Sequence, residues 1–503
     1  MKKQYILAHD IGTSGNKASL YDQEGKILSS TYQTYETWFD KDGYAEQSPE
    51  DWWEAIKNTS KKVIVESGVP ARDVVAMSFS SQSCGCIPID EQGNVLTDKV
   101  MIWMDNRATA EAEEILNTYG ERRHYETTGA SFHAAAFPCS KIMWLRRHEP
   151  EVYNKTFKFI GVKDYIIMKL TGKFGVTDYT EASFSGMLDI HTHEFDQELM
   201  DIVGVDRSRL CELKESTTVI GTVKPELESE TGLTPDCKVM LGMIDNVSCS
   251  IGGGCMDFGT FVINLGTAAW IGVSSDKPLM SPNFKSNCIY VGNGVYYTSM
   301  HSHSACASYD WVLNNLLAKY ENNFDLLADL ASKVPPGSDK LFFLPSFSSG
   351  NSLYTSSDMG GAFIGMRLHH DTGNIVRAVM EWVGFDLMMA GRFFEEIGVS
   401  MKKIRIVGGG SKSYLWRQML ADMLNVEIEV PEGMQHIGTL GAAVAGGIGS
   451  GIFDDYRIID HLVKASSINT PDKEAHEQYM KLLPIFKQCY ENLMPVFDRF
   501  SDI

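Results

Sequence analysis

Two short segments that lie half a chain apart share one layout of residues. Residues 5–21 form an apolar stretch, a turn rich in Gly, Thr and Ser, and a second stretch with strand character. Residues 261–276 repeat this order, and the matching pairs are Asp10 with Asn264, Gly12 with Gly266, Thr13 with Thr267, and Asp22 with Asp276. Gly-Thr turns are common, so coincidence is the alternative. The spacing is kept as far as Asp276, which favours two related halves that each open with a strand–turn–strand.

The first turn has the chemistry of a phosphate site. Its backbone N–H groups and hydroxyls, from Gly12, Thr13 and Ser14, can close around phosphate oxygens. Asp10 at its mouth can hold Mg²⁺, since hard cations prefer carboxylate and water oxygens. Two such turns facing each other would hold a triphosphate, although the chain has no Gly-x-x-x-x-Gly-Lys-Ser/Thr motif. An ordinary hairpin with a polar turn is the other interpretation.

Length and charge narrow the class of protein. A chain of 503 residues is too long for a single hydrophobic core. We therefore expect two domains, at 1–250 and 251–503, with the boundary near the glycines at 252–254. The net charge of −20 argues against nucleic acid or an anionic membrane as a partner. There is no apolar run long enough for a membrane span or a signal peptide. The ten cysteines lack metal-site spacing, so we expect free thiols in the cytoplasm.

Strand and helix patterns alternate, as in an α/β protein. Ser48 and Pro49 open a helix that ends at Gly68. The other expected helices cover 108–118, 140–148, 374–397, 414–424 and 439–448, and the expected strands cover 73–79, 403–407 and 426–430. The glycines 408–410 join a strand to a helix, an arrangement that lets backbone approach a nucleotide.

Asp245 is the candidate general base. It ends the apolar strand 238–244 and is followed by Asn246, which can hydrogen-bond a neighbouring hydroxyl. Phosphoryl transfer to an alcohol needs positioning, charge neutralisation and a carboxylate that accepts the hydroxyl proton. The alternative is a structural aspartate that caps the helix beginning at this point.

Several further stretches together resemble the FGGY family of carbohydrate kinases, most closely its xylulokinase-like members. They are found from residue 5 to about residue 450 in the order that the family has, and Ala136 departs from the residue usual at the start of one family signature. The stretches are Asp10-Ile-Gly-Thr-Ser, Tyr44-Ala-Glu-Gln-Ser-Pro-Glu-Asp-Trp-Trp, Trp103-Met-Asp-Asn-Arg, Pro138-Cys-Ser-Lys-Ile-Met-Trp, Gly361-Ala-Phe-Ile-Gly-Met with Asn374-Ile-Val-Arg, and Gly408-Gly-Gly-Ser-Lys-Ser.

The resemblance implies two actin-like, ribonuclease-H-like ATPase domains with a cleft between them. Sugar would bind to the first domain and ATP to the second. Asp245 would deprotonate the attacking hydroxyl, and Asp10 would help to place Mg²⁺. Thr13 and Thr267 would flank the phosphates, and Lys17 would reach phosphate unless it is a solvated strand lysine. The residues implied around the adenosine are Gly409, Gly410 and Ser413.

The acceptor loop departs from the family pattern. Xylulokinases commonly carry Gln-Met-His-Gly, where this chain has Gln82-Ser83-Cys84-Gly85. A thiol is a weaker hydrogen-bonding group than imidazole, so D-xylulose is in doubt as the substrate. Another ketopentose such as ribulose, a pentitol, or an aldonate such as gluconate remains open. Trp103 is expected to stack on the sugar or else to lie in the core.

Other residues near these motifs have plainer interpretations. Asp105 and Arg107 read as a surface ion pair. His133 lies in a loop that the family places near the sugar, and we expect it to be a solvated loop histidine. The pair His301 and His303 has no further metal ligands in the sequence, and we interpret its spacing as chance.

The function expected from the sequence is therefore transfer of phosphate from ATP to a sugar, most simply a ketopentose. An actin-like ATPase without an acceptor is the alternative, and the sugar-side residues Trp103, Asp245 and Asn246 separate the two. A dinucleotide dehydrogenase is a third interpretation, but the turn at 408–410 lacks Gly-x-Gly-x-x-Gly. A small-molecule sugar is the expected partner, and a homodimer is compatible with the sequence.

Overall fold

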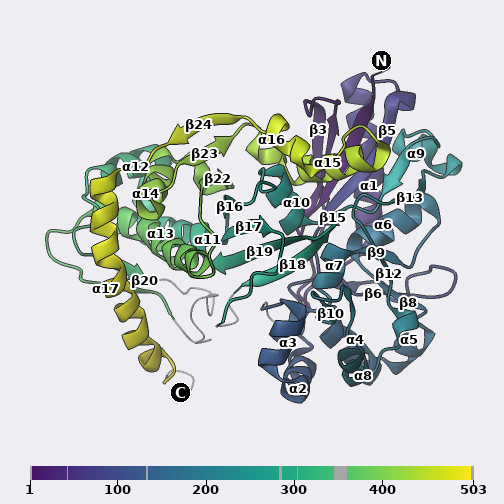
Figure 1. The fold of residues 1–503 in the computed structure, drawn as a ribbon, viewed down its shortest axis with the longest axis horizontal. Coiled ribbons are helices and arrows are strands. Elements are labelled where there is room, and N and C mark those ends of the chain that lie inside the picture. Colours follow the sequence, from purple (N-terminus) through teal and green to yellow (C-terminus); the bar gives the residue numbers. More distant parts are fainter. Residues whose placement is uncertain are drawn as a thin grey trace. The chain divides into compact units, whose positions relative to one another are not determined.

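The structure, a computed structural model, describes residues 3–41, 43–131, 134–282, 286–302, 304–344 and 360–499 (Figure 1). The chain divides into two compact units. The first consists of Met1–Gly252, Ser275–Thr298 and His436–Leu462, and the second consists of Gly253–Ser274, Ser299–Gln435 and Val463–Ile503. One break falls after Gly252, beside the boundary expected from the sequence. The chain then returns to the first unit twice, so a single boundary does not describe the packing.

The repeat seen in the sequence appears as two copies of one strand arrangement. β1 (Tyr5–Ile11) pairs antiparallel with β2 (Gly15–Tyr21) and parallel with β5 (Val74–Ser81). β16 (Thr260–Leu265) pairs in the same way with β17 (Ala269–Ser275) and β22 (Lys403–Val407). Asp10 and Asn264 are each the last residue but one of their strand. The expected α/β fold with two related halves is confirmed.

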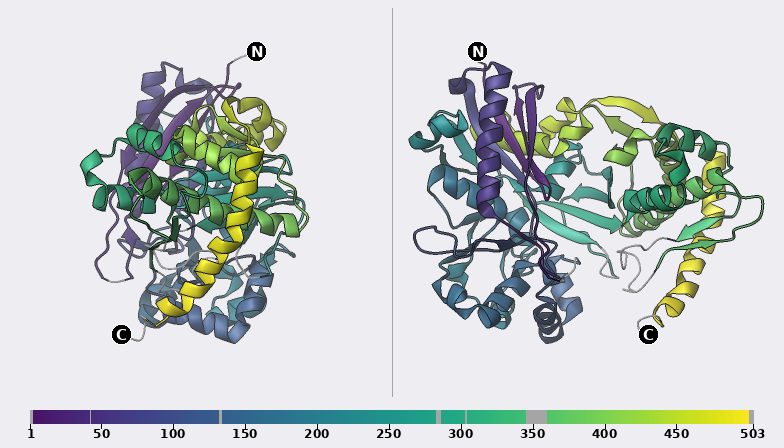
Figure 2. Two further views of the ribbon diagram at one scale, coloured as in Figure 1. Left: turned by 90° about the vertical axis from the view of Figure 1, so that its left-hand side faces the viewer. Right: turned by 180° about the vertical axis from the view of Figure 1, so that it is seen from behind.

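Helices cover both faces of the sheet in the first unit. The strand order is β13-β14-β5-β1-β2-β3, with β15 also paired to β5. Alternate side chains of β1 point to opposite faces. Leu7 packs in a cluster with Trp52 of α1 (Pro49–Ser67) and Ile166 of α6 (Val162–Thr171), whereas Ile6 packs with Ala442 of α15 (Ile437–Ser450). In the right-hand view of Figure 2, which is seen from behind, α1 lies along the strands. The bounds of the other strands are Ile27–Thr34 for β3, Val219–Thr222 for β13, Lys238–Met240 for β14 and Met243–Ile244 for β15.

The sheet of the second unit contains the second copy of the hairpin at its centre. The strand order there is β19-β17-β16-β22-β23-β24. The long helix α13 packs against α11, α12 and α14. The bounds of these elements are Val295–Ser302 for β19, Ile428–Pro431 for β23, Ala465–Asn469 for β24, Ala305–Asn315 for α11, Phe324–Ser332 for α12, Thr372–Glu396 for α13 and Tyr414–Leu424 for α14.

Most expected elements lie within two residues of their observed bounds, and the differences have local causes. Ser48 occupies the N-cap of α1, but its side chain accepts no first-turn N–H. The strand expected at 238–244 is broken into β14 and β15, because Gly242 adopts φ 70° and a Cβ there would lie 2.3 Å from the carbonyl oxygen of Phe79. Three further helices of the first unit are α2 (Thr109–Tyr119), α4 (Pro138–His148) and α7 (Tyr179–Ser183).

Two further expectations from the sequence concern the cysteines and membrane-spanning helices. All ten cysteines are free, and each is buried or half-buried, as expected. Among the helices that the structure describes, none is long and apolar enough to cross a membrane.

Two helices of the first unit approach each other closely through glycines. α10 (Asp245–Gly252) begins at the candidate base and crosses α15. A Cβ at Gly441 would lie 2.0 Å from the carbonyl oxygen of Ser248, and the Ser248 hydroxyl donates to the carbonyl of Gly438 at 2.8 Å. The position of α10, and therefore of Asp245, depends on this contact.

Gly441→Ala should destabilise the protein, because the new methyl group must push α10 and α15 apart. Overpacking of this kind costs about 1–3 kcal/mol, and the measurement is the unfolding free energy in denaturant. The matched control is Ser450→Ala in the same helix, which should stay within about 0.5 kcal/mol of the parental protein. Equal stability of Gly441→Ala and the control would contradict the close approach.

Candidate active site

Two carboxylates lie at one edge of the first sheet because three strands end there. Asp10 of β1 pairs with Ser80 of β5, and the Ser80 hydroxyl donates to Asp10 Oδ1 at 2.7 Å. Met243 of β15 is in register with the same Ser80, and Asp245 follows two residues later. The carboxyl ends of parallel strands meet at a common edge, where open α/β sheets place their ligands. Asp10 and Asp245 are thus brought together from opposite ends of the first unit's sequence.

Burial raises the pKa of both carboxyl groups at this edge. The pKa of Asp245 is raised to about 7, first by burial and then by the negative charge of Asp10. The N–H of Asn246, which donates to Asp245 Oδ1 at 2.7 Å, opposes this shift. Burial also raises the pKa of Asp10, against the Ser80 hydrogen bond and the charge of Lys17. A carboxyl group with a pKa near neutrality can take up and release a proton under working conditions.

The start of α15 leaves room for the Asp10 carboxylate. A Cβ at Gly438 would lie 2.6 Å from Asp10 Oδ2. A glycine in the first turn of the helix therefore lets the carboxylate approach the helix start, where free N–H groups favour negative charge.

The first phosphate-type turn is tied to neighbouring loops by side chains. Trp103 Nε1 donates to Thr13 Oγ1 at 2.8 Å, and Gln47 Nε2 donates to the Thr13 carbonyl at 2.6 Å. The Tyr35 hydroxyl donates to the carbonyl of Gly12. Ser14 is exposed at the tip, and Lys17 faces Asp10 across the β1–β2 pair. Trp103, expected at the sugar, thus contacts the turn expected at the phosphates.

Gln47 joins this turn to the acceptor loop and fixes the orientation of Gln82. The indole of Trp52 can only donate, and it donates to Gln47 Oε1 at 2.9 Å. That oxygen also accepts from Gln82 Nε2 at 2.7 Å. Gln82 is therefore held with its Oε1 free, and this buried oxygen has no hydrogen-bond partner among the residues that the structure describes. The sequence did not single out Gln47, although it lies within the Tyr44–Trp53 stretch.

Cys84 is held in an unusual backbone conformation. Its φ of 61° lies in the left-handed region, which costs roughly 1–2 kcal/mol for a residue with a side chain. The Cys84 thiol is buried and lies 3.8 Å from the carbonyl oxygen of Phe184, while neighbouring Ser83 is half-buried. Burial raises the pKa of the thiol to about 12, so no thiolate is present for nucleophilic chemistry at neutral pH.

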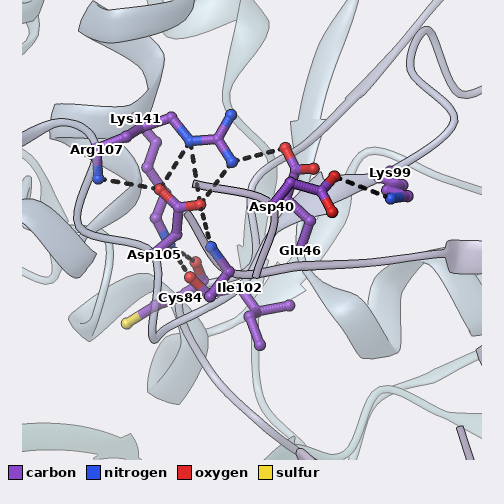
Figure 3. A network of polar contacts seen from close by, with 9 residues as sticks. Asp40, Glu46, Cys84, Lys99, Ile102, Asp105, Arg107 and Lys141 are labelled. Atoms are coloured by element: carbon purple, nitrogen blue, oxygen red, sulfur yellow. Dashed lines mark hydrogen bonds and ion pairs between the residues drawn. The ribbon is translucent and has the colours of Figure 1, made fainter. Parts of the chain in front are cut away.

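The ion pair of Asp105 and Arg107 is buried, which corrects the expectation of a surface pair. The Asp105 side chain is 0% exposed and that of Arg107 is 6% exposed. Arg107 Nη2 contacts Asp105 Oδ2 and Glu46 Oε1, each at 2.6 Å, as Figure 3 shows. The Asp105 carboxylate also accepts from the N–H of Ala45, and the guanidinium lies 3.6 Å from the ring centroid of Tyr44. These neighbours lie about 60 residues earlier in the chain, so the spacing of Asp105 and Arg107 alone could not reveal them.

In the second unit, the expected nucleotide residues gather where β16 and β22 end. A Cβ at Gly408 would lie 2.7 Å from Asn264 Oδ1, and one at Gly410 would lie 2.6 Å from Leu265 Cγ. Gly409 faces open space. The Ser413 side chain caps α14 by accepting from the Trp416 N–H at 3.3 Å. Thr267 is exposed, and the carbonyls of Gly266 and Thr267 accept from N–H groups at the start of α11.

Among the described residues, one group that contains histidines has the spacing of a metal site. His133 and His303 lie outside the described residues, and His301 contacts the hydroxyl of Ser299 at 3.0 Å. Asp339, His369 and His370 could together reach a metal ion. However, His370 Nδ1 accepts the N–H of Arg367, whereas a histidine bound to metal through Nε2 donates from its other nitrogen. His369 Nε2 contacts Asp339 Oδ2 at 2.8 Å, and this hydrogen bond lowers the pKa of the Asp339 carboxyl group.

Comparison with known proteins agrees with this architecture. Residues 5–252 match the N-terminal domain, and residues 261–450 the C-terminal domain, of the FGGY family of carbohydrate kinases. The xylulose kinase of Lactococcus lactis is 30% identical over 97% of both chains. The gluconokinase of Bacillus licheniformis is 28% identical, covering 96% of this chain and 94% of that protein.

Solved structures extend the likeness to the whole fold. The gluconate kinase and the ligand-bound xylulose kinase of Lactobacillus acidophilus each superimpose with a TM-score of 0.93 and 28% identity, covering 99% of this chain and 100% of theirs. The match is thus continuous through both units. The chain belongs to the FGGY family of carbohydrate kinases, enzymes that transfer a phosphoryl group from ATP to a sugar hydroxyl.

Proposed function

We propose that this kinase phosphorylates a ketopentose such as D-xylulose, with Asp245 as general base. The observation that carries this proposal is the half-buried Asp245 at the shared sheet edge, with its pKa near 7. In this mechanism the Asp245 carboxylate accepts the proton of the sugar hydroxyl as that oxygen attacks the γ-phosphorus, and ADP leaves. Asn246 follows the base directly and orients a neighbouring hydroxyl.

Hydrogen-bond acceptors dominate the proposed sugar pocket. Gln82 Oε1 and Asn246 Oδ1 are both buried without a partner among the described side chains and backbone groups. Buried acceptors of this kind are costly unless a ligand supplies donors. The hydroxyls of a neutral polyol can do so, and Gln82, Ser83, Cys84 and Trp103 complete the substrate-binding set that we propose.

An aldonate such as gluconate is the competing substrate, since relatives named gluconokinase match the chain about as well as those named xylulose kinase. A carboxylate needs a cation or several N–H donors. Among the described residues, two buried cations near the acceptor loop are already engaged: Lys141 Nζ donates to two backbone carbonyls, and Arg107 is paired with two carboxylates. This engagement favours an uncharged ketose or pentitol.

For the phosphate donor, ATP, we propose a set of contacts in each unit. Gly12, Thr13, Ser14 and Lys17 in the first unit would contact phosphate. The proposed contacts in the second unit are Gly266 and Thr267 with phosphate, and Gly409, Gly410 and Ser413 with adenosine. Asp10 is half-buried and has the carboxylate oxygens that suit Mg²⁺. When bound there, the ion would neutralise phosphate charge.

A panel of D-xylulose, D-ribulose, pentitols and gluconate in a coupled ADP assay tests the proposal. We expect ADP release that depends on a ketopentose, with little release when no acceptor is added. Preference for gluconate would overturn the choice of substrate. ADP release that is independent of every acceptor would favour an ATPase instead.

Asp245→Ala should lose activity while keeping nucleotide binding. Removal of a general base typically costs about 10²–10⁴-fold in rate, to which lost positioning of the hydroxyl adds. The measurement is kcat with saturating sugar, with ATP binding followed by calorimetry. The matched control is Asp201→Ala, which removes an exposed carboxylate of the same unit and should leave kcat unchanged. A kcat near the parental value for Asp245→Ala would remove Asp245 from the mechanism.

The raised pKa of Asp245 predicts a pH-dependent effect on stability. A carboxyl group whose folded-state pKa is raised from 3.8 to about 7 favours the protonated form in the folded state, so it costs stability as pH rises from about 4 to about 7. Asp245→Asn mimics the neutral form. It should therefore raise the unfolding free energy by at least about 1 kcal/mol more at pH 8 than at pH 4. Equal effects at both pH values would contradict the shift.

Gly409→Ala tests the adenosine contact without disturbing the fold. Because a Cβ at Gly409 meets no atom within 4 Å in the protein, the melting temperature should stay unchanged. A methyl group against the nucleotide should raise the KM for ATP several-fold and leave the KM for sugar near its parental value. Gly410→Ala is the contrast, since its Cβ would press on Leu265 and should lower the melting temperature. An unchanged KM for ATP in Gly409→Ala would show that adenosine does not contact this turn.

A further inference from the structure

Lys141 is a fully buried lysine whose side chain bridges two loops. It lies on α4 and is 0% exposed. Its Nζ donates to the carbonyl oxygen of Cys84 at 2.8 Å and to that of Ile102 at 2.7 Å. Figure 3 shows the side chain running between the two loops to reach both carbonyls. Cys84 belongs to the acceptor loop, and Ile102 immediately precedes Trp103.

The contacts of Lys141 differ from those of an ordinary buried ion pair. The neighbouring carboxylate, Asp105, is occupied by Arg107 and by the N–H of Ala45. Lys163 is also fully buried. In contrast to Lys141, its Nζ contacts two carboxylate oxygens, Asp164 Oδ1 and Asp178 Oδ1, each at 2.9 Å. Burying an ammonium group is costly. At Lys141 this cost is offset by hydrogen bonds to the backbone carbonyls of two loops.

One of these bonds supports a strained peptide. Cys84 has φ 61°, and such a conformation persists only where its surroundings hold it. The Cys84 carbonyl accepts from Lys141 Nζ at 2.8 Å. The peptide group that follows Cys84 is therefore held by a buried polar side chain.

The second bond leads to the phosphate turn. Lys141 fixes the carbonyl of Ile102, the next residue is Trp103, and the Trp103 indole donates to Thr13 Oγ1. The path therefore runs from the acceptor loop, through one ammonium group, to the turn at residues 12–15. Apart from the peptide link between Ile102 and Trp103, each step is a hydrogen bond between buried or half-buried groups.

We propose that Lys141 is a positioning residue for the acceptor sugar: it holds Cys84 in its left-handed conformation and sets the distance between the acceptor loop and Trp103. The inference rests on the proposed function, in which both of these elements contact the sugar. Lys141 itself acts only through the two backbone carbonyls.

Lys141→Met tests this role, since it keeps the length and apolar stem of the side chain and removes the donors. We expect kcat/KM for the sugar to fall about 10- to 100-fold, because small misplacements of a substrate have effects of this size. ATP binding, measured by calorimetry, should change less than about twofold. The matched control is Met143→Ala on the same helix, a buried position whose substitution should lower the melting temperature without changing kcat/KM for the sugar.

A double-mutant cycle with Cys84→Gly separates positioning from general stability. Glycine adopts φ 61° without strain. The loop in Cys84→Gly should therefore depend less on the Lys141 hydrogen bond, and replacing Lys141 should reduce kcat/KM less. The effect of Lys141→Met on kcat/KM should be at least threefold smaller in the Cys84→Gly background. Met143→Ala combined with Cys84→Gly should show additive effects. Additivity of the Lys141 and Cys84 changes, or an equal loss in Met143→Ala, would overturn the inference.

The two proposals can fail separately. The assays use whichever acceptor the panel identifies, and a parental-like kcat in Asp245→Ala would overturn the proposed function whatever Lys141→Met does. If Lys141→Met does not fold, Lys141→Gln serves in the same cycle, because its shorter side chain cannot reach both carbonyls. An unchanged kcat/KM for the sugar in that variant would overturn the role of Lys141.

Discussion

Parallel pairing of β1, β5 and β15 is the constraint on which the site depends. It ends three strands at one edge and places Asp10 and Asp245 there, although 234 residues of chain separate them. Two carboxylates that share a buried edge cannot both ionise cheaply. Burial first, and then the charge of Asp10, raise the pKa of Asp245, and this rise suits the group to proton transfer. The chemistry therefore follows from strand register and not from Asp245 alone.

A polar network connects this edge with the acceptor loop. Gln47 contacts both Thr13 and Gln82, and Trp103 contacts Thr13. Groups expected from the sequence to bind sugar and groups expected to bind phosphate are thus linked by direct hydrogen bonds within the first unit. Buried networks in which most members are satisfied hold their side chains in one arrangement, and here they leave Gln82 Oε1 free for a ligand.

Local patterns predicted much of the fold but few of the contacts within the site. The hairpin repeat, β22 and α14 follow from periodicity and turn residues, which act over short distances along the chain. The burial of Asp105, the break at Gly242 and the role of Lys141 depend on partners distant in sequence, which no local pattern reveals. The contact of the Cys84 thiol with the Phe184 carbonyl was missed for the same reason, because Phe184 follows α7 and lies a hundred residues from the acceptor loop in sequence.

The central claim is that Asp10 raises the pKa of Asp245. Carbon-13 NMR titration of carboxyl-labelled aspartate tests this directly, with Asp245→Asn used to assign the resonance. Asp245 should titrate near pH 7 in the parental protein and at a distinctly lower pH in Asp10→Asn, because one negative charge has been removed. A parental pKa near 4, or the same pKa in both proteins, would contradict the account.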